Sequence, residues 1–262
     1  MNPVAAARVS LSTFTVVPVS SQALDRRTAR GAMLLAPLVG VAVGAVAALV
    51  VVLFRLAIDV EEPYNLLIAV AGVCVLTAAS RGLHLDGLAD TADALGSYRG
   101  PAAAAEIMAR GDIGPFGIAA IVLCLLLQVG GLHGCLEAHR ATEGLIVAAM
   151  AGTLSATVAC VGVPAARPVG LGAAVAGSVR AWQAVLAVAL SALVAAVAGS
   201  IDEASGLHGS VRAVAALGIG LVVAQLFMRH AVHRFGGISG DVFGAVVEVA
   251  MTTTLIAVAV IR

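Results

Sequence analysis

Apolar segments long enough to cross a lipid bilayer recur along the whole of this 262-residue chain. A helix of about 20 apolar residues spans a hydrocarbon core of ~30 Å. The segments lie at approximately 32–57, 64–80, 117–133, 144–164, 181–199, 211–228 and 242–260. Lipid offers no hydrogen bonds to the backbone, so a spanning element must be a helix or a closed barrel. Because these runs are continuous rather than alternating, the sequence predicts an all-α, polytopic membrane bundle of about seven transmembrane helices.

Composition supports this fold class and narrows the choice of partners. Apolar residues make up 61% of the chain and charged residues 11%, which is too few polar side chains for the surface of a soluble fold. The formal net charge is zero, so nothing indicates a nucleic-acid partner. We expect one membrane-embedded domain over residues 1–262, in which residues 1–31 form an interfacial lead-in.

The charges of the connecting segments predict how the chain is oriented. The segments rich in arginine are residues 1–31 and loops 81–116, 165–180 and 229–241. Of the connections between them, 58–63 and 200–210 contain no arginine but carry the acidic residues Asp59, Glu61, Glu62, Asp202 and Glu203, and 134–143 contains a single arginine, Arg140. Arginine-rich loops face the cytoplasm in multi-pass proteins. We therefore expect the N-terminus and three distant loops to share the cytoplasmic face of the cell membrane.

Three of the chain's fifteen acidic residues lie within one short segment after the second apolar run. Asp86, Asp90 and Asp93 stand at positions i, i+4 and i+7. In a helix these positions fall within an arc of about 60°. Clustered carboxylates repel one another unless a cation neutralises them, and hard oxygen ligands suit Mg²⁺ or Mn²⁺. The spacing predicts a metal site, although a solvated acidic helix face would show the same spacing.

Two neighbours of this cluster have an ambiguous role. His84 could contact phosphate or another ligand, but a histidine at a membrane interface is equally well explained by local hydrogen bonding. Arg81 could pair with phosphate, or it could anchor the end of its helix at the interface.

Two glycine-containing segments lie in or at the edges of the arginine-rich loops 81–116 and 229–241. The first runs from Asp112 to Gly117, and its glycines and proline predict a non-helical turn at the start of a span. The second contains Gly237, Gly240, Asp241 and Glu248, of which the two acids share one helix face. Glycine-rich backbone can present N–H groups to an anion. If the loops share one face, these residues lie beside the acidic cluster.

Phosphoryl transfer would use all three kinds of group expected at this membrane face: carboxylates, arginines and exposed backbone N–H groups. In such a reaction a metal neutralises the charge of a pyrophosphate while an alcohol attacks one of its phosphorus atoms. The same residue types could also bind a cation for transport.

The segment Gly82-Leu-His-Leu-Asp86-Gly-Leu-Ala-Asp90-Thr-Ala-Asp93 resembles the signature of the cobalamin synthase, or adenosylcobinamide-GDP ribazoletransferase, family. Further blocks of the chain agree with the family in the same order. They are 11–18, 36–44, 113–117, 170–172 and 236–245. The chain departs from the family pattern at three places. The acid that precedes the Ile113-Gly114 turn is shifted by two residues, to Asp112, which follows Arg110. Ala156 stands where the family often has an arginine, and Met251 stands where it often has a glutamate.

The resemblance implies a transferase of cobalamin biosynthesis that requires Mg²⁺. In that reaction the 3′-hydroxyl of α-ribazole, or of its 5′-phosphate, attacks the phosphorus on the corrinoid arm of adenosylcobinamide-GDP, and GMP leaves. Asp86, Asp90 and Asp93 would bind the metal, and Asp93 or Asp241 would act as the general base. The residues expected to bind substrate or phosphate are Arg81, His84, Asp112, Gly237, Gly240 and Glu248.

Two other classes of protein remain as alternatives. A lipid enzyme similar to CDP-alcohol phosphotransferases also uses spaced aspartates, but this chain lacks the Ala-Arg that usually follows Asp-Gly in that signature. A cation-coupled transporter would carry carboxylates near the bilayer midplane, whereas these acids lie at the ends of apolar runs.

Overall fold

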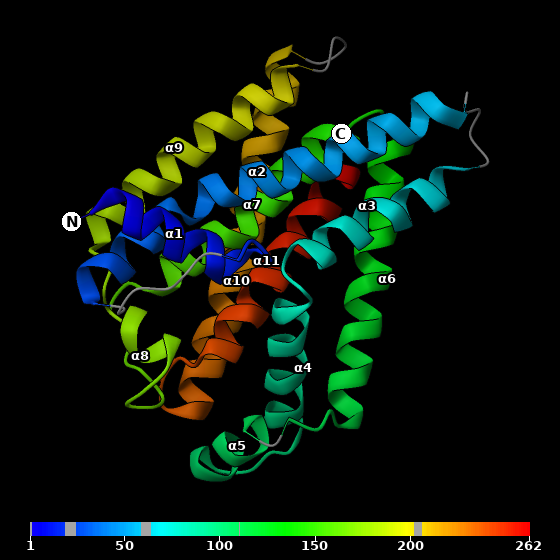
Figure 1. Cartoon of the computed structure of the whole chain (residues 1–262). Helices are drawn as coiled ribbons and strands as arrows, with labels where there is room; N and C mark the ends of the chain where they lie inside the picture. Colours follow the sequence, from blue (N-terminus) through cyan, green and yellow to red (C-terminus); the bar gives the residue numbers. More distant parts are fainter. Residues whose placement is uncertain (1, 19–24, 59–63, 110, 202–205) are drawn as a thin grey trace.

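The computed structural model describes residues 2–18, 25–58, 64–109, 111–201 and 206–262, which fold into eleven helices (Figure 1). The helices are α1 (Pro3–Phe14), α2 (Arg26–Ile58), α3 (Asn65–Ala79), α4 (Leu83–Gly96), α5 (Pro101–Met108), α6 (Pro115–Glu137), α7 (Ala141–Ala159), α8 (Leu171–Val175), α9 (Ala181–Ser200), α10 (Gly206–Phe235) and α11 (Gly240–Val260). Arg110 and the acidic residues of loops 58–63 and 200–210 used in the orientation argument lie outside the described residues.

The predicted fold class is confirmed. Six of the described helices, α2, α6, α7, α9, α10 and α11, are long and apolar enough to cross a membrane. The expected second span is shorter than a bilayer requires, because α3 has 15 residues. It continues into α4 after a bend of 86°, and the pair counts as a seventh span only if both helices are taken together. The chain is a multi-pass membrane protein.

Two helices form the centre of the bundle. Within the most apolar stretch of each helix, 83% of α7 and 78% of α11 is buried inside the protein. The corresponding shares for α6 and α9 are 28% and 17%. Figure 1 shows α7 and α11 behind and between α2, α4 and α10. Small residues permit this packing: a Cβ added at Gly40 of α2 would lie 2.5 Å from the backbone oxygen of Ala149 in α7. Helices in lipid associate through such close approach of backbones.

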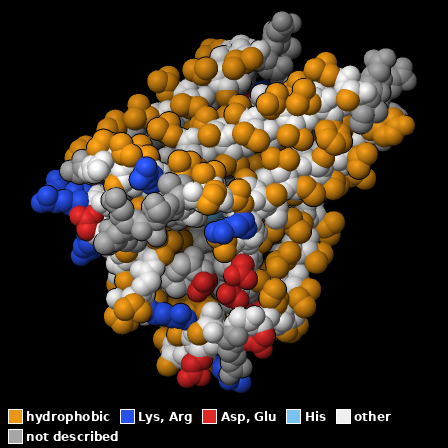
Figure 2. Space-filling model, in the orientation of Figure 1, with side chains coloured by type: hydrophobic (Ala, Val, Ile, Leu, Met, Phe, Trp, Pro, Cys, Tyr) orange, Lys and Arg blue, Asp and Glu red, His pale blue; other side chains and the backbone are white. Residues whose placement is uncertain are grey.

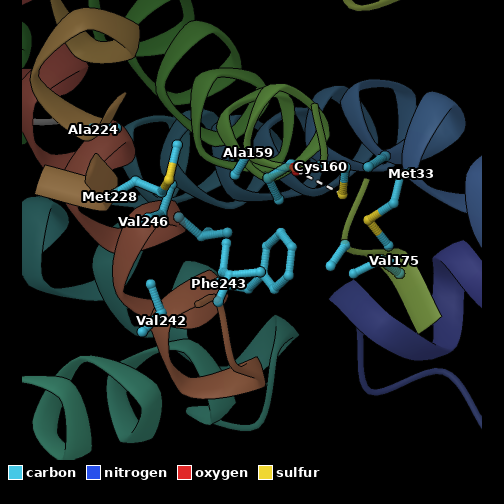
Figure 3. Packing of buried hydrophobic residues seen from close by; sticks show 14 of the residues in the cluster. Met33, Ala159, Cys160, Val175, Ala224, Met228, Val242, Phe243 and Val246 are labelled. Carbon is cyan, nitrogen blue, oxygen red and sulfur yellow. Dashed lines mark hydrogen bonds between the residues drawn. The ribbon is translucent and has the colours of Figure 1, made fainter. Parts of the chain in front are cut away.

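The part of the core nearest the site joins five helices. Met33 of α2, Cys160 after α7, Val175 of α8, Met228 of α10 and Phe243 of α11 belong to one buried cluster (Figure 3). These residues come from distant parts of the sequence, so the cluster fixes the end of the bundle at which the three arginine-rich loops meet.

Two boundaries differ from the expectation. Loop 81–116 is largely helical, because it contains α4 and α5. Residues 26–31 belong to α2 rather than to an interfacial lead-in, since the helix extends beyond its apolar run. Helix α1 makes up most of the described lead-in and packs along α2.

Candidate active site

The turn between α3 and α4 determines where the acidic helix points. Arg81 and Gly82 both have left-handed backbone conformations, with φ of 57° and 71°. A left-handed arginine is uncommon because its Cβ approaches the backbone, whereas glycine adopts this conformation readily. The two residues redirect the chain by 86°, so that α4 runs beside α6 and α11. The side chain of Arg81 is exposed at this corner.

Helices α4 and α11 cross at glycines. A Cβ added at Gly87 would lie 2.6 Å from the backbone oxygen of Asp241, and one added at Gly244 would lie 3.2 Å from the Cα of His84. Only glycine fits at Gly87, because the obstructing atom belongs to the backbone. The crossing brings the acids of α4 next to the first turn of α11.

The carboxylates at this crossing form an acidic surface. Asp86 is exposed, and Asp90 and Asp241 are partly buried. The charges of Asp86, Asp241, Asp93 and Asp112 all act on Asp90, in that order of strength. Figure 2 shows acidic side chains gathered over α4, with basic side chains above and below them and apolar side chains covering the upper part of the molecule. This surface would attract a cation.

The donors fit a magnesium ion that also binds substrate. No three His, Cys, Asp or Glu side chains among the described residues are arranged as a complete metal cage. Mg²⁺ rarely uses such a cage: it keeps several waters and binds through one or two carboxylates together with substrate phosphates. Asp86 and Asp90, one helical turn apart and accessible, are suitable for this role.

The side chain of Asp93 contacts the start of α6. Its Oδ2 accepts a hydrogen bond from the Gly114 backbone N–H at 2.7 Å, and its Oδ1 accepts one from the Gly117 N–H at 2.9 Å. A carboxylate at a helix N-terminus satisfies free N–H groups and interacts favourably with the helix dipole. The turn predicted before this span is therefore tied to α4 by Asp93, and both carboxylate oxygens are engaged.

The segment before α11 pairs with the loop after α7. The Ile238 N–H donates to the Pro164 carbonyl at 2.9 Å, and the Ala166 N–H donates to the Ile238 carbonyl at 3.0 Å. Gly237 lies against this loop, since an added Cβ would be 2.5 Å from the Ala165 carbonyl carbon. The arginine-rich loops 165–180 and 229–241 thus lie together, as they can only if they share one face, and α4 joins them through Gly87.

A polar cavity of about 120 Å³ lies where these loops meet. It is lined by Arg167, by residues 169–173 and by residues 238–241. Arg167 is held by a hydrogen bond from Nη2 to the Ala105 carbonyl at 2.6 Å, and its charge acts on Asp241. Ser239 caps α11 by accepting from the Val242 N–H at 3.3 Å. The N-terminus of α11 and one arginine therefore face this cavity, which suits an anion.

The residue that sequence reasoning missed here is Arg167. It appeared only as a charge in the orientation pattern. The backbone pairing between Pro164 and Ile238 brings it to the site, and no local motif predicts a pairing over so many residues.

A second, largely apolar cavity of about 220 Å³ adjoins the first. The two share Leu171, Gly240 and Asp241. Asp86 and His84 of α4 also line the second cavity. The His84 ring, partly buried, lies against the ring of Phe14, with centroids 5.9 Å apart. Helix α1 thus contributes a wall of the site.

Two of the expected substrate-binding residues are placed differently. Asp112 is exposed, and its charge has the weakest effect on Asp90 among the four neighbouring acids. Glu248 lies two turns into α11, buried between α6 and α11, and lines neither cavity beside Asp241. Its Oε2 accepts from Gln128 Nε2 at 2.7 Å. Its contacts give no support to the prediction that it binds substrate.

The fold and these cavities define a multi-pass membrane protein with an acidic surface, a polar cavity lined by an arginine and a helix N-terminus, and an adjoining apolar cavity. The profile of the cobalamin-5-phosphate synthase family matches residues 6–259. The chain belongs to that family.

Similar proteins cover nearly the whole chain. Adenosylcobinamide-GDP ribazoletransferase of Frankia casuarinae is 45% identical over 97% of this chain and 94% of its own length. The proteins of the same name from Nocardioides sp. and Corynebacterium efficiens are 38% and 34% identical, over 95% and 96% of this chain and 96% and 90% of their own lengths. No solved structure matches the chain.

Proposed function

We propose that this chain transfers the adenosylcobinamide-phosphate group from adenosylcobinamide-GDP to the 3′-hydroxyl of α-ribazole or its 5′-phosphate. The new P–O bond forms to the acceptor oxygen, the P–O bond to GMP breaks, and the acceptor proton passes to a base. The observation that supports this most strongly is the crossing of α4 and α11, which places accessible carboxylates beside an arginine and a helix N-terminus. Family membership favours this reaction over lipid phosphotransfer or cation transport.

The residues divide into three roles in this proposal. Asp86 and Asp90 would hold Mg²⁺, which supplies neutralisation of the pyrophosphate charge when bound. Arg167 and the N–H groups at the start of α11 would bind phosphate oxygens. Asp241 lines both cavities and is the better candidate for the base, because both oxygens of Asp93 already accept backbone hydrogen bonds. Asp93 would position the start of α6.

The arginine pattern supports a cytoplasmic position for this end of the bundle in the cell membrane. One experiment tests reaction and orientation together: donor and acceptor are added to inverted and to right-side-out membrane vesicles that contain the chain. The donor does not cross the membrane, because its pyrophosphate is charged. We expect acceptor-dependent GMP release, with a cobamide product identified by mass spectrometry, in inverted vesicles and only after permeabilisation in right-side-out vesicles.

Each part of the proposal can fail separately in this experiment. No GMP release in inverted vesicles or in detergent would contradict the reaction. Release by intact right-side-out vesicles would contradict the orientation while leaving the reaction in place.

A further inference from the structure

The apolar cavity beside Asp241 has no assigned ligand. Its inner wall is formed by Met33, Ala156, Val175, Phe243 and Val247, each at most 5% exposed. Asp241 lies at the end shared with the polar cavity, and Asp86 also lines the apolar cavity. Figure 3 shows Phe243 of α11 on one side of this region and Met33 and Val175 on the other. The site therefore has two lobes that meet at Asp241.

The chemistry of the apolar lobe excludes most parts of the two substrates. The buried residues that line it, Met33, Ala156, Val175, Phe243 and Val247, carry no charge and no hydrogen-bond donor on their side chains, so a pyrophosphate among them would lose its hydration without compensation. The polar edge of a guanine would lose its hydrogen bonds against methyl, thioether and phenyl groups, which costs free energy. An apolar cavity of roughly 150 Å³ holds benzene, so the cavity of about 220 Å³ accommodates a bicyclic ring but not a corrin macrocycle.

The fragment that fits is a planar, weakly polar heteroaromatic ring. Ribazole is a nucleoside whose base is a benzimidazole carrying two methyl groups. With this base in the apolar lobe, its ribose would lie at Asp241, next to the polar lobe where phosphate oxygens bind. Aromatic walls such as Phe14 and Phe243 suit a flat ring.

We propose that the apolar lobe binds the base of the acceptor nucleoside, and that Met33, Ala156 and Phe243 determine which bases are accepted. This inference rests on the proposed function, because it assigns the acceptor of that reaction to a part of the site. It makes these three residues determinants of specificity rather than of catalysis.

The test is to reduce the lobe from a single position and to measure acceptor selectivity. Ala156→Leu adds three carbons at the inner wall. A methyl-sized misfit in an apolar pocket changes affinity by roughly 10–200-fold. We expect Ala156→Leu to raise KM at least about tenfold for the nucleoside with the dimethylated base and less than about threefold for one with unsubstituted benzimidazole. The KM for the GDP-bearing donor should not change.

The matched control is Ala159→Leu, one turn further along α7. Ala159 is fully buried in the same core cluster but does not line the lobe. Ala159→Leu should lower stability by overpacking, as Ala156→Leu does, but the preference between the two acceptors should stay that of the wild type.

A second variant covers the case in which Ala156→Leu does not fold. Met33→Ala enlarges the lobe, so the relative rate with a nucleoside of bulkier base should rise. Unchanged selectivity in the variants that fold, or an increase in donor KM instead, would overturn the assignment. If the wild-type chain released no GMP with any acceptor, the proposed function would fail, whereas an active wild type with unaltered selectivity in the variants contradicts only this inference.

Discussion

The aspartates of α4 share one pattern in the sequence but differ in their surroundings. Asp86 is exposed, and no hydrogen bond joins its side chain to another described residue. Asp93 is 8% exposed and accepts two backbone hydrogen bonds from the start of α6. Removing the charge from each residue should therefore have different consequences.

We expect Asp93→Asn to destabilise the protein and Asp86→Asn to leave it stable. An asparagine keeps one acceptor but turns an amide N–H₂ toward a backbone donor, so one of the two charge-assisted hydrogen bonds is lost. Such a bond contributes roughly 1.5–3 kcal/mol. Replacement of the exposed Asp86 should change the free energy of unfolding by less than about 0.5 kcal/mol. Thermal unfolding followed by circular dichroism in detergent gives both values.

The same pair of variants separates positioning from catalysis. Asp86→Asn should lose GMP release while folded, and Asp93→Asn should lose activity in parallel with stability. An Asp93→Asn protein that is as stable as the wild type but inactive would show that Asp93 takes part in the reaction directly, as the resemblance first implied.

At the scale of helices, the site depends on how closely α4 approaches α11. Gly87 lies at the point of contact, and a side chain there meets the backbone of Asp241. Backbone atoms cannot rotate away as a flexible side chain does, so the helices must separate. The distance between the acids of α4 and the first turn of α11 would then increase.

We expect Gly87→Ala to reduce GMP release by at least about 100-fold, since a displacement of about 1 Å can have this effect. Overpacking should also lower the free energy of unfolding by about 1–3 kcal/mol. Gly218→Ala on α10 is the control, because an added Cβ there meets nothing within 4 Å. It should retain activity, and it should stabilise its helix slightly. Equal activity of the two variants would show that the close approach at Gly87 is not needed.

The sequence was informative about helices and much less so about their junctions. Apolar runs such as 181–199 predict spans because length and hydrophobicity alone set the requirement, and α9 matches that run within one residue. The sharp bend at Arg81 has no such signal, since arginine rarely adopts a left-handed conformation. Positions i, i+4 and i+7 place Asp93 on the face of Asp86, but they do not reveal that α6 begins beside it.

On the scale of the whole molecule, the site is assembled from segments far apart in the chain. The order of arginine-rich loops predicts that residues 81–116, 165–180 and 229–241 share one face of the membrane. The pairing of Pro164 with Ile238 and the contact at Gly87 bring parts of these segments together. The partners within that meeting point, such as Arg167 with the N-terminus of α11, depend on tertiary packing. The walls of the apolar cavity likewise combine α1, α2, α4, α7, α8 and α11, which no single motif encodes.

The central claim is that accessible carboxylates of α4 form the metal site of a phosphoryl-transfer reaction. Electron paramagnetic resonance of Mn²⁺, which binds the same oxygen ligands as Mg²⁺, measures metal affinity directly in purified protein with the donor and no acceptor. The wild type and Glu106→Gln, which removes an exposed acid on α5, should bind Mn²⁺ alike. Asp86→Asn and Asp90→Asn should each bind it at least about tenfold more weakly. Mn²⁺ affinity that is unchanged in both aspartate variants would contradict the claim.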